Sequence, residues 1–433
     1  MVVLSERASV RRLHDRLGFG PRPGDLDRGF TETRDRLLGG GPDAGAAGTP
    51  PPELGPPAGS SGQNADAMAK KQDGAEVRAQ ADRAAGWWLD RMAAADLASV
   101  ERLTWFWHGH FATGEQKVRS PWLMLAQNRT QREHALGRFT DLARAMVVDP
   151  AMLLWLDGNK NRTGSPNENL SREFMELFAL GVGHYREDDV REAARALTGW
   201  TAARGATGAR LIPKRHDDGV KQVLGVSGDL SAESLVDLVL NRPESAPFVA
   251  GRIWFRLVSA APPPADTLNR LVAAYGSARD IRSLLRAITE EPAFHDSATS
   301  LVKQPVEWLA GLLRALGVRP GSLDAKTRAR LLSGLRAMGQ IPFQPPSVGG
   351  WAAGGAWLTS SSGVARLELA RLVAAHADLP AVATAHDRAA AIGDRLGVDR
   401  WSDRTRAALA HVTGDVRELS ALAACAPEYV VSG

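Results

Sequence analysis

The chain is poor in cysteine and has no long apolar run, and each absence excludes a class of protein. Its single cysteine, Cys425, excludes an internal disulfide framework and a metal cage made only of cysteine. No run approaches the roughly eighteen apolar residues that cross a bilayer, and the opening MVVLSERASV has no apolar segment typical of a secretion signal. We therefore expect a cytoplasmic protein without a membrane span.

Blocks of like charge are also missing. The chain has 53 Lys and Arg against 49 Asp and Glu, a net charge of +4 in 433 residues, and the arginines are spread along the sequence. Nucleic-acid-binding arms usually concentrate their basic residues. The distribution therefore predicts no nucleic-acid partner.

Several common catalytic motifs are absent. The sequence contains no phosphate-binding GxxxxGK loop, no GxSxG nucleophile elbow, no HExxH metal motif and no CxxCH haem-attachment motif. Nucleotide and serine-hydrolase chemistries therefore have little support, and any haem would be held without a covalent bond.

Alternating strand patterns are nearly absent too, with KQVLGV as the best candidate. Apolar residues recur instead at steps of three and four, the period of an amphipathic helix. The sequence predicts an all-α fold, a large irregular bundle of many helices with long functional loops. The clearest helical patterns lie at about 120–148, 166–180, 189–198, 231–241, 244–258, 266–275, 278–290 and 303–316, with four or five more between 323 and 430.

Composition divides the chain into four parts. Residues 1–38 are predicted to be helices that pack on the main domain, and the Gly/Pro-rich residues 39–72 to be a flexible linker or insertion. Residues 73–375 form the predicted main helical domain with the candidate site. Residues 376–433 are predicted to be Ala-rich helices.

The stretch SPNENLSREFMELFALGVGHY begins like a well-capped helix. Ser165, Pro166 and Glu168 are typical of a helix N-terminus, and Gly181 can end the helix in a left-handed conformation. Glu173 and Glu176 then fall on or beside the apolar stripe. A buried carboxylate is costly unless it is paired, protonated or bound to metal.

Two interpretations of these carboxylates remain open. Arg172 is four residues from Glu176, and Arg191 or Arg195 in the next helix offers an ion-pair partner for Glu173, so both carboxylates fit structural clamps. Alternatively, Glu173 and Glu176 form part of a catalytic or metal site.

Histidines supply the other candidates. His108 and His110 lie in WFWHGHF, and they can share a ligand only if the helix ends at Gly109 between them. His216, Asp217 and Lys221 lie together in KRHDDGVKQVLG, where they are expected to donate, accept and shuttle protons. Buried structural histidines and an ordinary Asp-Gly turn are the alternatives.

Eight ordered motifs between about residues 11 and 375 resemble those of a large bacterial family, the domain of unknown function 1800. They are RLGFGPRPGDL, WFWHGHF, DPAMLLWLDGNKN, NENLSREFMELFALGVGHY, DVREAARALTGW, HDDGVKQVLG, KQPVEWLAGLLRALG and MGQIPFQPPSVGGW. The resemblance implies a mostly helical fold and, from gene neighbourhood, a sulfatase-like or phosphatase-like partner protein. It implies no activity and no catalytic residues. Many relatives begin with export signals, which this sequence does not show.

The first functional hypothesis is a metal- or cofactor-dependent enzyme with a buried His/Glu site under loops rich in Trp, Pro and Gly. Its expected catalytic residues are His110, Glu173, Glu176, His216 and Asp217. His108, His110, Glu173 and Glu176 suit Zn, Fe or Mn, and non-covalent haem is a weaker variant. Cofactor or substrate contacts are expected from Trp200, Trp351, Trp357 and Lys221.

The second hypothesis is a non-catalytic binding or assembly protein that docks the sulfatase-like partner. The loop PFQPPSVGGW would then be the docking surface, with exposed Trp and Pro side chains as its main contacts.

Overall fold

The computed structural model describes residues 3–56, 67–205 and 208–433, and its described part is dominated by helices. Strands are confined there to three two-stranded antiparallel sheets: β1 (Trp200–Thr201) with β2 (Arg210–Leu211), β3 (Lys221–Val223) with β4 (Val226–Gly228), and β5 (Leu301–Val302) with β6 (Val431–Ser432). The predicted all-α class is confirmed, and KQVLGV is the hairpin β3–β4. None of the helices in these ranges is long and apolar enough to cross a bilayer.

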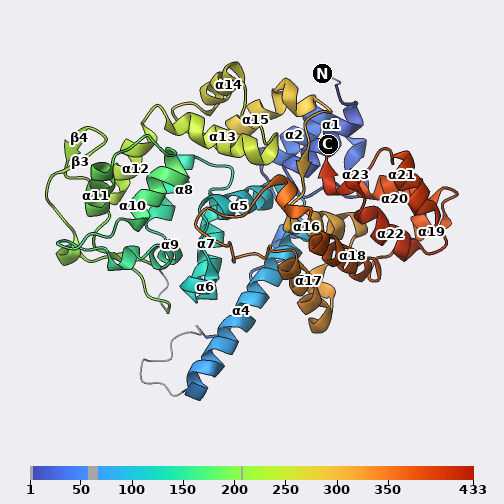
Figure 1. Ribbon diagram of the computed structural model, residues 1–433, viewed down its shortest axis with the longest axis horizontal. Helices are drawn as coiled ribbons and strands as arrows, with labels where there is room; N and C mark the ends of the chain where they lie inside the picture. Colours follow the sequence, from blue (N-terminus) through green and yellow to red (C-terminus); the bar gives the residue numbers. More distant parts are fainter. Residues whose placement is uncertain (1–2, 57–66, 206–207) are drawn as a thin grey trace.

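The N-terminal part includes a long helix that extends from the body of the molecule (Figure 1). Its elements are α1 (Glu6–Arg16), η1 (Asp25–Asp27), α2 (Phe30–Gly39), α3 (Ala44–Ala47) and the extended α4 (Ala67–Ala94). Helices α3 and α4 therefore occupy part of the expected 39–72 linker, whose residues 57–66 lie outside the described ranges.

The middle of the chain forms one side of the molecule (Figure 1). Its helices are α5 (Ala98–His110), α6 (Glu115–Val118), α7 (Pro121–Glu133), α8 (Phe139–Val147), α9 (Pro150–Trp155), η2 (Gly158–Lys160), α10 (Asn169–Glu173), η3 (Phe174–Ala179), α11 (Glu187–Ala196), η4 (Pro213–Arg215), α12 (Ala232–Leu240), α13 (Ser245–Leu257), α14 (Ala265–Tyr275), α15 (Ile281–Glu290) and η5 (Pro292–His295).

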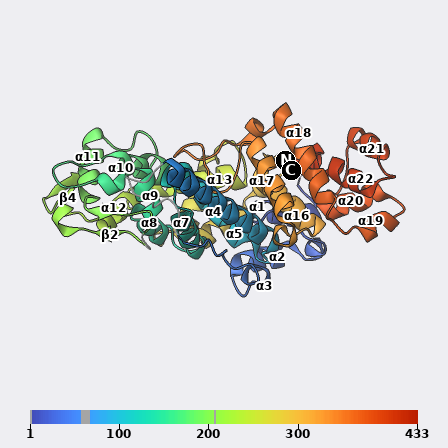
Figure 2. The ribbon, with the colours of Figure 1, turned by 90° about the horizontal axis from the view of Figure 1, so that it is seen from below.

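The C-terminal part forms the other side. Its helices are α16 (Pro305–Leu316), η6 (Pro320–Ser322), α17 (Ala325–Ala337), η7 (Gly354–Trp357), α18 (Ser360–Ala374), α19 (Pro380–Thr384), α20 (Arg388–Leu396), α21 (Asp403–Ala410), α22 (Val416–Ala424) and α23 (Pro427–Val430). Both views place the two chain ends side by side next to α1 (Figures 1 and 2). Both ends are held by the segment before α16, because Val3 bridges Asp296 and β6 pairs with β5.

Two apolar cores lie on either side of α5. Trp105 belongs to the core shared with α4, α16 and α18, whereas Phe106 and Trp107 belong to the core formed with α8, η3, α12 and α13. Neighbouring helix positions are about 100° apart, so a helix with large apolar residues all round can pack on both sides. Helix α5 is therefore the wall between the two cores, and both histidines of WFWHGHF lie on it.

The helix predicted from SPNENL starts later and changes form. It begins at Asn169, because the side chain of Asn161 accepts a hydrogen bond from the Asn167 amide at 2.9 Å and holds the preceding residues in a turn. From Phe174 to Ala179 it is a π-helix, a wider coil that is rare and often found at functional sites. Gly181 ends it with φ of 92°, as predicted.

Candidate functional site

Helix α5 does not end at Gly109, so its two histidines do not share a ligand. It continues through His110, and residues two apart then point in nearly opposite directions. The Nε2 atom of His108 accepts a hydrogen bond from the Phe343 amide at 3.1 Å, among the rings of Trp88 and Trp351. Burial lowers the pKa of His108 to about 3, so this imidazole is neutral.

His110 points into the other core and contacts the π-helix. Its Nε2 donates to the backbone carbonyl of Phe178 at 2.9 Å, so the neutral ring keeps its lone pair on Nδ1. That Nδ1 is buried and has no hydrogen-bond partner. Burial, together with the nearby charge of Arg252, lowers the pKa of His110 to about 3.

The segment α10–η3, which carries Glu173 and Glu176, therefore contacts His110 through the backbone carbonyl of Phe178 and not through these carboxylates. No hydrogen bond or ion pair in the described ranges joins Glu173 or Glu176 to His110 or His216. Glu176 accepts from the hydroxyl of Tyr185. Glu173 is half-buried, and burial followed by the charge of Glu176 raises its pKa.

The arginine clamps expected for Glu173 have other partners. Arg195 binds Asp217 with two hydrogen bonds, at 2.8 and 3.0 Å, and Arg191 pairs with Asp188. The Arg195 contact holds the pKa of Asp217 down to about 2. Asp217 also accepts from the Gly219 backbone amide at 3.0 Å, a turn contact, and Arg195 is its ion-pair partner and not a clamp on Glu173.

The loop residues His216 and Lys221 are also held by local contacts. His216 donates from Nδ1 to the Thr198 carbonyl at 2.9 Å. Lys221 is fully buried and pairs with Asp229 at 2.7 Å. Trp200, in β1, packs at the edge of the second core. These contacts explain the positions of all three side chains.

The expected metal ligands do not form a metal-binding group. Across residues 3–56, 67–205 and 208–433, no three or more His, Cys, Asp or Glu side chains are arranged to hold an ion. His108 and His110 diverge, and each commits its Nε2 to a backbone hydrogen bond. The residues present therefore do not fit the expected metal, and no chemical step is derived through one.

The tryptophans expected to be exposed on loop 341–358 are instead buried, whereas Pro346 on the same loop is exposed. Trp351 is 5% exposed and stacks on Trp105 with ring centroids 4.8 Å apart, and Trp357 is 6% exposed. The reason is that the loop fills the space between α5 and the first core. As expected for Trp351, its ring lines a cleft, which it shares with His110.

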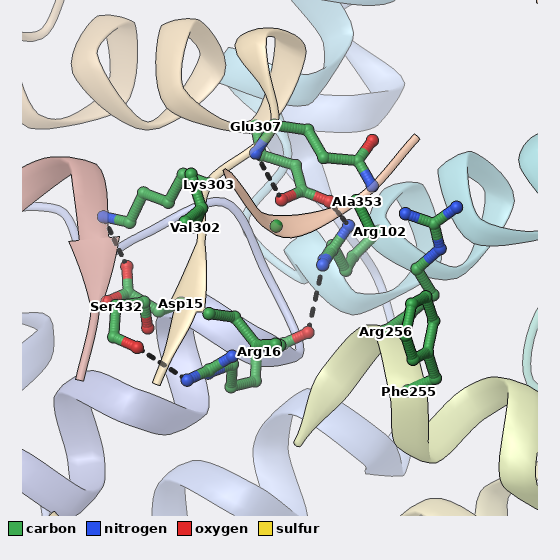
Figure 3. Close-up of a pocket in the computed structure, with 13 residues that line it drawn as sticks. Asp15, Arg16, Arg102, Phe255, Arg256, Val302, Lys303, Glu307, Ala353 and Ser432 are labelled. Carbon is green, nitrogen blue, oxygen red and sulfur yellow. Dashed lines mark hydrogen bonds and ion pairs between the residues drawn. The ribbon is translucent and has the colours of Figure 1, made fainter. Parts of the chain in front are cut away.

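This cleft has two adjoining lobes with residues in common. The outer lobe, with a cavity volume of about 30 Å³, lies where α1, α13, β5, η7 and β6 meet (Figure 3). The inner lobe, with a cavity volume of about 20 Å³, lies between α5, α13 and Trp351 and reaches His110. Both are lined by Arg102, Arg256, Gln304 and Glu307.

The charged lining of the cleft is mostly cationic. Five basic side chains face it against two carboxylates, and both carboxylates are paired: Asp15 with Lys303 at 3.0 Å, and Glu307 with Arg102. The Glu307 carboxylate also accepts a hydrogen bond from the backbone amide of Gln304, at 3.1 Å, at the start of α16. The basic residues are Arg16, Arg102, Arg252, Arg256 and Lys303.

Three of these guanidinium groups have no carboxylate partner within the described residues. Arg16 donates to the Ser432 carbonyl at 2.7 Å, but its Nε and Nη1 are buried without partners. Arg256 donates to the carbonyls of Trp351 and Ala352, at 2.7 and 3.1 Å. Arg252 forms no hydrogen bond or ion pair.

Desolvation is the main electrostatic effect on these arginines. Burial lowers the pKa of Arg16 to about 9 and that of Arg256 to about 10, and it lowers the pKa of Arg252 as well. A buried charge without a counter-ion is unfavourable, and a bound anion would relieve that cost. The cleft is therefore complementary to an anion.

The sequence motifs did not point to these arginines. Arg252 and Arg256 lie four residues apart in GRIWFRL, so they share a helix face, and that face is otherwise apolar. The sequence pattern that could have identified them is arginine between large apolar residues, as in GRIWFRL. This pattern indicates buried cations, but it does not show that the fold brings α1, α5 and α13 together around one cleft.

Fold and site together define a helical protein with a small cleft lined mostly by cationic side chains. The chain belongs to the family described as protein of unknown function (DUF1800), whose model matches residues 12–431. The family resemblance of the eight motifs is thereby confirmed over nearly the whole chain. No curated protein and no solved structure gives a significant match.

Proposed function

We propose that the protein binds a small anionic ligand, a carboxylate, phosphate or sulfate, in the cleft between α1, α5 and α13. The observation that carries this proposal is the set of three guanidinium groups, on Arg16, Arg252 and Arg256, that face the cleft without a carboxylate partner. Arginine recognises carboxylates and oxyanions through short, charge-assisted hydrogen bonds. The cavity volumes of the two lobes, about 30 and 20 Å³, leave room for only a few heavy atoms, so the ligand must be small.

Enzymatic use of this cleft is the form of the proposal that the geometry favours. A neutral imidazole whose Nδ1 has no partner lines the same cleft as the cations, and it could act as a general base once a bound anion offsets the burial and the Arg252 charge that lower its pKa to about 3. The catalytic centre of this proposal is therefore His110. Catalytic roles for Glu173, Glu176, His216 and Asp217, and a role for a metal, stay predictions with less support.

Arg252→Gln is the variant that tests the proposal most cleanly, because this side chain has no hydrogen bond or ion pair whose loss would disturb the fold. Calorimetric titration with phosphate, sulfate and acetate at low ionic strength should show saturable binding by the native protein. The variant should bind roughly 10- to 150-fold more weakly, since a hydrogen bond to a charged group contributes about 1.5–3 kcal/mol.

Arg417→Gln is the matched control, because Arg417 is an exposed helical arginine whose side chain has no hydrogen bond or ion pair. It removes the same charge from the surface and should leave anion affinity unchanged. Absence of saturable binding, or equal weakening in both variants, would show that the cleft is not an anion site.

A partner protein remains a separate proposal. The family resemblance supplies the sulfatase-like candidate, and Trp351 and Trp357 are too buried to be its main contacts on loop 341–358. Co-purification of the two proteins, expressed together, would test the pairing.

A further inference from the structure

The inner lobe of the cleft contains unpaired groups of both hydrogen-bonding kinds. His110 offers an acceptor, its Nδ1, which is buried without a partner. Trp351 offers a donor, its indole Nε1, which is also buried without a partner. Both side chains line the same lobe, next to the unpaired guanidinium of Arg252. A buried polar atom left without a partner costs about 1–3 kcal/mol, a cost that a ligand or a water molecule in the lobe would offset.

The role of each atom follows from its contacts. The hydrogen bond from Nε2 to the Phe178 carbonyl, at 2.9 Å, places the ring proton of neutral His110 on Nε2, so Nδ1 only accepts. The Phe178 carbonyl is available because it lies in the last turn of the π-helix, where carbonyls have no partner within the helix. The indole nitrogen of Trp351 only donates. A ligand that satisfies both must accept and donate.

The surroundings of His110 leave few other sources for such a contact. Its ring lies among Phe106, Phe111 and Phe139, which have no polar side-chain atom, and Trp107, whose indole Nε1 already donates to the Ala135 carbonyl at 3.0 Å. The charged group that acts on it is Arg252, which is a donor and has no partner of its own. The imidazole, the indole and the guanidinium therefore define an acceptor, a donor and a cation in one small space.

From these atoms we infer that the ligand of the cleft is a hydroxylated anion, such as a small hydroxy acid or a phosphorylated alcohol. The anionic group binds the arginines, and the hydroxyl donates to Nδ1 of His110 and accepts from Nε1 of Trp351. A hydroxyl group is the simplest polar group with both capacities. This inference rests on the proposed anion site and adds the chemical class of its ligand.

Paired probes separate this inference from the proposal on which it depends. Glycolate and acetate differ by one hydroxyl, so their affinity ratio measures the hydroxyl contact alone. We expect native protein to bind glycolate about 3- to 10-fold more tightly than acetate, the range of a net hydrogen bond. In His110→Phe, which keeps an aromatic ring of similar size and removes Nδ1, the ratio should fall to about one while acetate binding persists.

The outcomes are distinct. If neither probe binds, the proposed anion site itself fails. If both bind native protein equally, the anion site stands and the hydroxylated ligand is wrong, because water or nothing then satisfies His110 and Trp351. The ¹⁵N resonance of His110 Nδ1 provides a second measurement in native protein, should His110→Phe fail to fold. It should shift with glycolate and stay constant with acetate; equal shifts would overturn the inference.

Discussion

Burial shifts the pKa values of several single residues in this protein toward the neutral form of the side chain. His108 and His110 are neutral because burial disfavours the charged imidazole, and each is oriented by one backbone hydrogen bond. Asp149 is the acidic counterpart. It caps α9 by accepting from the Met152 amide at 2.9 Å and also accepts from Gln127 at 2.7 Å, yet burial raises its pKa to about 7.

The raised pKa of Asp149 predicts a pH-dependent contribution to stability. Its pKa in the folded protein, about 7, lies above its ordinary value of 3.8. Between pH 3.8 and pH 7, the Asp149 carboxyl is therefore protonated in the folded protein and ionised in the unfolded chain. This contribution is complete below pH 3.8 and is lost as the pH rises through 7. The free energy of unfolding of native protein, relative to Asp149→Asn, should fall by about 1 kcal/mol per pH unit between pH 5 and 7.

Urea denaturation of both proteins at pH 5, 6, 7 and 8 measures this difference. The two stability profiles should converge or cross as the pH rises and become parallel above about pH 7. Profiles that are parallel throughout would mean that Asp149 is ionised in the folded protein over the whole range.

At the scale of elements, the sequence predicts where helices lie better than how their side chains meet. Amphipathic periodicity located α16 almost to the residue, because Pro305 and Glu307 are a strong start signal and the helix is apolar on its buried face. The helix from SPNENL was misplaced at its start, and its π-helical turn was missed. A π-helix arises from tertiary packing, and no local sequence pattern encodes it.

The candidate site was predicted only in part, for the same reason. His110 and Trp351 were predicted as site residues, and both line the cleft. Glu173 was predicted to meet His110 because a carboxylate on an apolar stripe needs a partner. Instead, the π-helix that follows Glu173 places the Phe178 carbonyl against the imidazole of His110, at the end of α5. Arg16 and Arg252 lie 236 positions apart, a pairing that no spacing in the sequence reveals.

The contact between α5 and the Trp351 loop depends on a glycine. Gly350 has φ of 78°, and a Cβ placed on it would lie 2.4 Å from the Gly109 carbonyl oxygen. We expect Gly350→Ala to displace the loop and lower the free energy of unfolding by about 2–3 kcal/mol, because both the clash and the left-handed backbone are unfavourable. Denaturant unfolding monitored by tryptophan fluorescence measures this loss.

Gly349→Ala is the matched control for that loop. A Cβ at Gly349 would meet nothing closer than the Ser347 hydroxyl at 3.6 Å, an ordinary contact. Its effect on stability should stay within about 0.5 kcal/mol, typical of an unstrained surface substitution. Equal losses in the two variants would show that the loop responds to any side chain and not to the approach of the Gly109 carbonyl.

Across the whole molecule, the cleft lies where the two chain ends meet the centre of the sequence. Arg16 at the end of α1 donates to Ser432, and β6 pairs with β5 immediately before α16 (Figure 3). Lys303, between β5 and α16, pairs with Asp15. Folding of the cleft therefore requires contacts across nearly the full length of the chain, and the cations near the mouth of the cleft also hold the chain ends together.

The ion pair between Asp15 and Lys303 tests this whole-molecule role. The two side chains are 1% and 7% exposed, and Arg11 lies farther from Asp15, at 3.5 Å. Lys303→Met should lower the free energy of unfolding by about 3–5 kcal/mol, because it leaves a buried carboxylate without its nearest cation. Asp15→Asn combined with Lys303→Met should recover part of that loss, since the buried carboxylate is then removed together with its nearest cation and only the more distant Arg11 loses a partner. Thermal and urea unfolding of the two single variants and the double variant measure the coupling. Strict additivity, or a loss below about 1 kcal/mol in Lys303→Met, would mean that the chain ends are held by the strand pairing β5–β6 and the apolar core alone.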